Sequence, residues 1–109
     1  MSYDIHLRAK VEGIDEYVDV AYGNNITWNV HELIKKSSGW KIKNEANDGL
    51  AEDIGYKCSV GIKELETNPK KYKRYESQNG WGTIPDTINF FQELLKVCKE
   101  YPYAYVFVD

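Results

Sequence analysis

The 109 residues of this chain are enough for one folded domain, residues 1–109. Hydrophobic residues make up 42% and charged residues 28%, which excludes a disordered chain. The net charge of −3 argues against indiscriminate binding to nucleic acid, and no apolar run reaches transmembrane length.

The first elements are two strands. Tyr3, Ile5 and Leu7 alternate with polar residues, a period of two that is typical of a strand with one buried and one exposed face. A turn at 12–15 is followed by a second alternating run from Tyr17 to Tyr22, so we expect a β-hairpin. The alternation leaves Asp4, His6 and Arg8 pointing outward.

A short helix is expected after the hairpin. Gly23-Asn24-Asn25 interrupts the second strand, and Asn29 with Glu32 three residues later has the spacing of a capping box. Ser37-Ser38-Gly39 should end this helix, because glycine readily takes the left-handed conformation of a C-cap.

The middle of the chain has the weakest pattern. Residues 40–43 alternate as in a short edge strand, and residues 44–53 are polar and acidic, as in a loop. We expect a second helix to begin near Ser59 and to end before Asn68-Pro69, because a residue preceding proline avoids helical geometry.

The last third predicts a loop, a helix and a strand. Residues 70–82 are typical of a loop, and Asp86 is a good N-cap for a helix whose apolar positions include Ile88, Phe91 and Leu95. Residues 104–108 are apolar on both faces, which favours a central strand. The fold class is therefore α+β: a small, mostly antiparallel sheet, made by the N-terminal hairpin and a C-terminal strand, packed on two or three helices.

No catalytic group, metal site or cofactor is predicted. Cys58 and Cys98 lack the close spacing of zinc ligands, so we expect two buried free thiols in a reducing cytoplasm. The acidic stretch 45–53 does not place oxygen ligands as a calcium loop does. His6 and His31 have no nucleophile at a spacing that indicates a pair. No signal peptide is evident at the N-terminus.

Two segments combine tryptophan with amides. They are residues 24–31 and Asn79-Gly80-Trp81-Gly82. Such residues are typical of a recognition site, since the ring supplies area and the amides supply directional hydrogen bonds, but they are equally typical of loops that lead into helices. The candidate ligand- or partner-binding residues are Asn25, Thr27, Trp28, Asn29, His31 and Trp81.

A basic and aromatic cluster is an alternative site. Lys70, Lys71, Lys73 and Arg74 surround Tyr72, a composition suited to phosphates and unpaired bases. A solvated face is the simpler explanation, because the run is short and belongs to an acidic protein.

Several segments together resemble a known group of proteins. They are Met1-Ser2-Tyr3-Asp4-Ile5-His6-Leu7, Asn25-Ile26-Thr27-Trp28-Asn29-Val30, Asn79-Gly80-Trp81-Gly82 and residues 91–108 with Leu94-Leu95, Cys98-Lys99-Glu100 and Pro102. As a set they resemble small, uncharacterised proteins of bacteriophages and bacterial mobile elements. The resemblance implies a small accessory protein in the bacterial cytoplasm, one that meets a host defence system.

The leading hypothesis is a non-catalytic protein that binds a host protein as a counter-defence factor, using an exposed face of its sheet. Self-association through that face or through a sheet edge, as a homodimer, is an alternative. The other hypotheses are a nucleotide-type ligand held by the tryptophan segments and weak nucleic-acid binding through residues 70–74. No contact with a membrane is expected.

Overall fold

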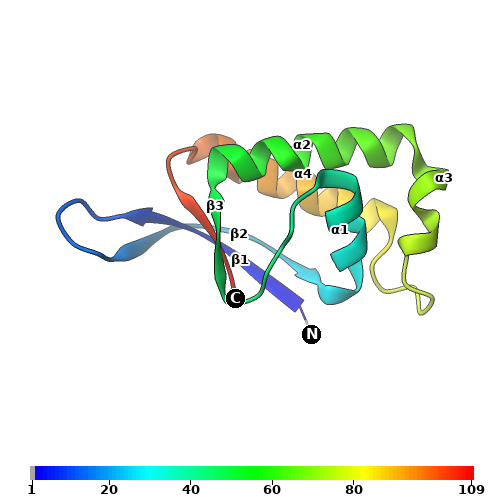
Figure 1. Ribbon diagram of the computed structural model, residues 1–109, viewed down its shortest axis with the longest axis horizontal. Helices are drawn as coiled ribbons and strands as arrows, with labels where there is room; N and C mark the ends of the chain where they lie inside the picture. Colours follow the sequence, from blue (N-terminus) through cyan, green and yellow to red (C-terminus); the bar gives the residue numbers. More distant parts are fainter. Residues whose placement is uncertain (1) are drawn as a thin grey trace.

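The computed structural model describes residues 2–109; Met1, which opens one of the resembling segments, lies outside them. The protein has two layers, with one antiparallel sheet below and helices above it (Figure 1). The strands are β1 (Ser2–Lys10), β2 (Tyr17–Thr27), β3 (Ala46–Leu50) and β4 (Tyr105–Val108), in the spatial order β2-β1-β4-β3. The predicted α+β class is confirmed.

The helices differ greatly in length. They are α1 (His31–Ser38), α2 (Ala51–Thr67), α3 (Pro69–Tyr72) and α4 (Ile84–Glu100), with 3-10 turns η1 (Trp28–Val30) and η2 (Lys73–Tyr75). The long helices α2 and α4 lie side by side over the sheet, and α1 packs against α2 (Figure 1). None of the helices in residues 2–109 has the length and apolarity needed to cross a membrane.

The predicted hairpin is confirmed, but β2 continues to Thr27 instead of breaking at Gly23. Val20 and Gly23 are extra residues relative to β1, so each forms a bulge. A Cβ atom on Gly23 would lie 3.0 Å from both Ile5 Cγ2 and Leu94 Cδ1. The missing side chain therefore lets the strand pass close to α4 without losing its pairing.

The predicted central strand is also confirmed. β4 pairs with β1 on one side and with β3 on the other. Val106 and Val108 are fully buried beneath the helices, whereas Tyr105 and Phe107 point to the opposite face of the sheet and are partly exposed.

The region from Trp40 to Tyr56 differs from the prediction. Residues 40–43 form no strand; the Trp40 ring is 2% exposed, stacks on Phe90 at 6.2 Å and donates from Nε1 to Asp48 Oδ2 at 2.8 Å. The third strand is β3, five residues that include Asn, Asp and Gly, which are poor strand formers and are held in place by pairing with β4.

Helix α2 begins at Ala51, well before the predicted start near Ser59. Glu52 and Asp53 lie in its first turn, where carboxylates interact favourably with the helix dipole. Gly55 and Gly61 lower the helix propensity of this segment but face α4, where a Cβ atom on Gly61 would lie 2.5 Å from Phe91 Cε2. Glycine is needed for this close approach of the two helices.

Both cysteines are buried and free, as predicted. Burial raises the pKa of both thiols, that of Cys98 to about 12. Neither is therefore a thiolate near neutral pH.

The helix ends agree only in part with the prediction. Gly39 ends α1 with φ of 77°, as expected. Asn29 is not an N-cap: Thr27 Oγ1 accepts from Asn29 N ahead of η1, and α1 has no side-chain cap. The N-cap of α4 is Thr83, and Asp86 is the third helical residue, which completes a capping box. Residues 69–75 are helical rather than a loop.

The hairpin extends beyond the rest of the molecule (Figure 1). β4 pairs with β1 only between Ile5 and Arg8, so residues 9–18, which we call the hairpin arm, have no third strand beside them. The arm helps to give the molecule a long axis of 48 Å against 26 and 17 Å. At its tip, Ile14 is 51% exposed.

Candidate functional site

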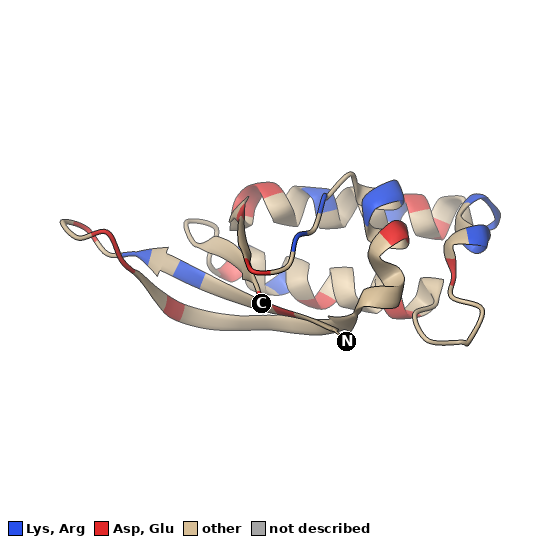
Figure 2. Cartoon of the chain, turned by 60° about the horizontal axis from the view of Figure 1, so that its bottom comes forward, with Lys and Arg blue, Asp and Glu red and all other residues tan. Residues whose placement is uncertain are grey.

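One face of the sheet is not covered by a helix. Figure 2 shows the sheet on one side of the molecule and the helices on the other. We call the uncovered side of the sheet the outer face; it carries the alternate side chains of β1, β2 and β4 that point away from α2 and α4. Its members are Asp4, His6, Arg8, Tyr17, Asp19, Tyr22, Asn25, Tyr105, Phe107 and the adjoining Asp109. Cross-strand partners share a face, so the register itself gathers these residues.

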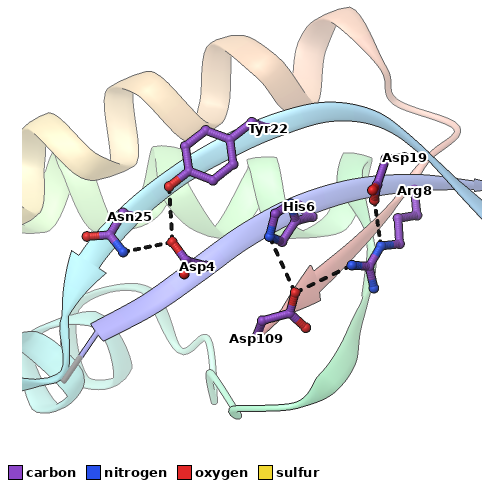
Figure 3. A network of polar contacts seen from close by, with 7 residues as sticks. All are labelled: Asp4, His6, Arg8, Asp19, Tyr22, Asn25 and Asp109. Atoms are coloured by element: carbon purple, nitrogen blue, oxygen red, sulfur yellow. Dashed lines mark hydrogen bonds and ion pairs between the residues drawn. The ribbon is translucent and has the colours of Figure 1, made fainter.

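Arg8 is the centre of a charged chain across the outer face. Its Nε donates to Asp19 Oδ1 at 2.7 Å, and its Nη2 donates to Asp109 Oδ2 at 3.4 Å (Figure 3). The same carboxylate oxygen lies 3.3 Å from His6 Nε2. The hydrogen bond from Arg8 lowers the pKa of Asp19. Polar contacts on the exposed side of the sheet thus join β1, β2 and Asp109, the residue that follows β4.

Asp4 is the centre of a second set of contacts. Its Oδ1 accepts from Tyr22 OH at 3.1 Å and from Asn25 Nδ2 at 2.8 Å (Figure 3). These two hydrogen bonds lower the pKa of Asp4, and partial burial together with the same contact raises that of Tyr22. Asn25, predicted to act with Trp28, therefore belongs to the outer face, where it also donates to Ser2 Oγ.

Aromatic rings surround these polar groups. Tyr17 meets Tyr105 and Phe107 edge-on at centroid distances of 5.6 and 5.0 Å, and the His6 ring meets Tyr22 at 5.4 Å. The guanidinium of Arg8 lies 4.8 Å from the centroid of Phe107, within the range of a cation–π contact. Tyr22 is 55% exposed and Tyr17 is 36% exposed, so these rings are accessible.

Trp28 and His31 come together elsewhere, around a residue that the sequence did not single out. Tyr3 OH lies 2.9 Å from His31 Nδ1, and the Tyr3 ring is 5.8 Å from that of Trp28. Burial raises the pKa of Tyr3. The indole Nε1 of Trp28 is buried and has no hydrogen-bond partner among residues 2–109. The Trp28 side chain is partly buried and packs against the hydrophobic core.

The two tryptophan segments touch through a glycine. A Cβ atom on Gly82 would lie 2.7 Å from Val30 Cγ1 and 3.2 Å from Asn29 Cβ, so the backbone of the 79–82 loop rests on η1. Trp81 itself is 69% exposed. The fold therefore brings the segments into contact, but one ring packs inward and the other points into solvent.

The basic cluster is partly neutralised. Lys73 Nζ lies 3.0 Å from Glu76 and Lys71 Nζ lies 3.9 Å from Glu64. Arg74 donates to the hydroxyl of Tyr75 and stacks on its ring at 4.9 Å. Lys70 and Lys73 border an open depression of about 550 Å³ with Pro69, Ile84 and Pro85. Two of the four cations, Lys71 and Lys73, are thus paired with carboxylates, whereas Lys70 and Arg74 have no ion pair among residues 2–109.

The outer face was only partly predicted. The sequence indicated Asp4, His6 and Arg8, but not Tyr17, Asp19 or the side chains of β4 that lie beside them. Strict alternation would place Tyr22 on the same side as Val18 and Val20. The bulge at Val20 instead moves Tyr22 to the face of Tyr17 and Asp19, and alternation does not fix which strands are neighbours.

No arrangement of three or more His, Cys, Asp or Glu side chains within residues 2–109 is suited to hold a metal ion. Comparison of the chain with protein-family models, with curated proteins and with solved structures gave no match. Function must therefore be argued from the site alone, and the resemblance to phage proteins stays a prediction.

Proposed function

We propose that this is a non-catalytic protein-binding protein whose contact surface is the outer face of the sheet. The observation that supports the proposal is that helices cover one face only, while the other presents tyrosine rings. It also presents an arginine, Arg8, that is held by neighbouring carboxylates (Figure 3). Tyrosine and arginine are enriched among the residues that dominate binding energy at protein interfaces.

The network favours binding because it fixes the side chains in advance. Arg8 is held by Asp19, Asp109 and the Phe107 ring, so little rotamer freedom remains to be lost on association. Each freely rotating side chain that a complex immobilises costs roughly 0.5–1.5 kcal/mol. A face ordered before binding avoids much of that cost.

The family resemblance directs the choice of partner. If the chain is a phage-type accessory protein, its partner is a host protein in the bacterial cytoplasm, and sequestering that protein would counteract a host defence. The outer face offers a contact surface for such a role.

Site-specific photocrosslinking in a bacterial lysate tests this function. A photoreactive phenylalanine analogue replaces Tyr22 on the outer face, and in a matched control it replaces Tyr56, which is 70% exposed on α2. We expect a discrete crosslinked protein from the Tyr22 position and none from the Tyr56 position. Equal crosslinking from both, or none from Tyr22, would reject the outer face as the contact surface.

A small-ligand site near Trp28 is a second candidate, favoured by the buried, unpaired Nε1 donor beside the Tyr3–His31 pair. A nucleotide carbonyl or phosphate oxygen is a suitable acceptor for that donor. Nucleotides titrated into a Trp81→Phe variant, which keeps Trp28 and Trp40 as the fluorophores, should change its emission. An unchanged spectrum with all common nucleotides would remove this candidate.

A further inference from the structure

We propose that the outer face and the hairpin arm bind a basic protein surface, rich in lysine and arginine. This inference rests on the proposed protein-binding function and adds the chemistry of the partner. The evidence for it is the distribution of charge over the hairpin and the exposed aromatic rings that lie among the carboxylates of the outer face.

The hairpin and the end of β4 hold most of the excess negative charge. Residues 2–27 and Asp109 contain six carboxylates and two cations, Arg8 and Lys10, a net charge of −4, whereas the whole chain has −3. Figure 2 shows acidic positions along both strands and at the tip of the arm. The six carboxylates are Asp4, Glu12, Asp15, Glu16, Asp19 and Asp109.

The two cations are already engaged. Arg8 lies between Asp19 and Asp109, and Lys10 Nζ lies 3.8 Å from Asp15. Asp4 is held as an acceptor by two neutral donors, Tyr22 and Asn25, which favour its ionised form. An approaching surface therefore meets ionised carboxylates whose charge is not cancelled within the face.

The rings add a second attraction for cations. Arg8 over Phe107 is a guanidinium–aromatic contact built into this face. Tyr17 and Tyr22 present further exposed rings beside Asp19 and Asp4, so a partner's arginine or lysine can pair with a carboxylate and stack on the neighbouring ring.

The same charges argue against other occupants. A second copy of the chain, docked face to face, would set carboxylates against carboxylates, and like charges juxtaposed at an interface are strongly unfavourable. Phosphate backbones and anionic lipid surfaces are repelled for the same reason. A basic protein surface is the occupant that complements the face.

The test uses the full chain, labelled with ¹⁵N, and a synthetic octalysine peptide as the probe, with octaglutamate as the peptide control. We expect octalysine to shift the amide signals of β1, β2 and the arm and to leave those of α2 and α3 unchanged. Its affinity should fall as salt is added, because exposed charges are screened. Octaglutamate should cause no shifts.

Two double variants with the same change in net charge decide where the peptide binds. Asp4→Asn with Glu16→Gln alters the outer face and arm, and asparagine can still accept from Tyr22 and Asn25, so the fold is kept. Glu66→Gln with Glu100→Gln alters exposed positions on the helices. We expect about five- to tenfold weaker binding for the first variant and less than about twofold for the second.

Three results would overturn the inference. They are equal weakening of octalysine binding in both variants, amide shifts spread over the helices, and a dimer in sedimentation that forms through the outer face. Different results would reject the proposed protein-binding function. A neutral or acidic protein crosslinked at Tyr22 would keep the protein-binding function and reject the basic partner. Octalysine binding at the face without any crosslinked protein at Tyr22 would reject the proposed function.

Discussion

Gly61 is the residue at which helix packing depends most directly on a missing side chain. A methyl group at this position would lie 2.5 Å from the ring of Phe91, which is fully buried and cannot move aside. Overpacking of this kind costs about 1–3 kcal/mol, and alanine recovers about 1 kcal/mol of helix propensity. We therefore expect Gly61→Ala to lower the free energy of unfolding by up to about 2 kcal/mol in chemical denaturation.

Gly55→Ala is the matched control on the same helix. Its new Cβ atom would lie 3.1 Å from Cys98 Cβ, a contact that a small shift relieves. The gain in helix propensity should offset most of this strain, so the free energy of unfolding should change less than in Gly61→Ala. The reverse order of the two variants would show that α2 and α4 pack differently.

Glu76 makes stability depend on pH at the start of α4. Its Oε2 accepts from Ile84 N at 2.7 Å and its Oε1 lies 3.0 Å from Lys73 Nζ, and the backbone hydrogen bond is the main reason why its pKa lies below the ordinary value. A lowered native pKa means stability that is present above the ordinary pKa of about 4.3 and lost as the pH falls through the native value.

We expect Glu76→Gln to reduce the free energy of unfolding at neutral pH by about 1 kcal/mol, since a charge-assisted hydrogen bond becomes a neutral one. The unfolding curves of the variant and the wild type should converge as the pH falls below about 4. Glu66→Gln, at an exposed position on α2, serves as the control for loss of a surface carboxylate and should change the free energy of unfolding at neutral pH by less than about 0.5 kcal/mol. A constant difference between Glu76→Gln and the wild type would contradict the assignment.

At the scale of the element, α4 depends on the capping box that follows the exposed Trp81 loop. Thr83 Oγ1 accepts from Asp86 N at 3.2 Å, and Asp86 Oδ2 accepts from Thr83 N at 3.1 Å. Loss of such a cap costs about 1 kcal/mol, so Thr83→Ala should lower the thermal midpoint measured by circular dichroism.

Thr27→Ala provides the comparison for this cap. Thr27 Oγ1 lies 3.4 Å from Asn29 N and caps only a three-residue turn, so its loss should lower the midpoint less than Thr83→Ala does. If Thr83→Ala had the smaller effect, the helix would be held by packing rather than by its cap.

The sequence predicted best those helices and strands whose own residues are enough to specify their structure. The alternation of β1 and the glycine after α1 needed no knowledge of the rest of the fold. β3 could not be found in this way, because Ala46–Leu50 is a strand only beside β4. The early start of α2 was missed because residues 44–53 are polar and acidic, as in a loop, whereas Glu52 and Asp53 lie in the first turn of the helix.

The candidate site, too, could be predicted only where local sequence was enough. Alternation indicated that Asp4, His6 and Arg8 face outward, but only the register places Phe107 opposite His6 and Tyr105 opposite Arg8. Trp28 and Trp81 stood out in the sequence because of their composition. The structure gives them different surroundings, one packed on Tyr3 and the other exposed.

At the scale of the whole molecule, stability should be uneven along the hairpin. β1 is flanked by strands on both sides between Ile5 and Arg8, whereas the arm has only its own two strands. We expect the amide of Val11, which bonds to Glu16 O, to exchange with solvent at least about 100-fold faster than those of Ile5 to Arg8, as followed by NMR. Uniform protection along the hairpin would mean that the arm is covered by another surface.

The central position of β4 also bears on how the chain is made. Synthesis proceeds from the N-terminus, and domains start to fold while the chain is still being extended. β1 and β2 are made early, yet the strand that fills the space between β1 and β3 comes about a hundred residues after β1. Until Tyr105–Val108 emerges from the ribosome, the edge of β1 that β4 later covers stays unpaired, in addition to the outer edge of β2. In that interval the nascent chain is most exposed to pairing with other chains.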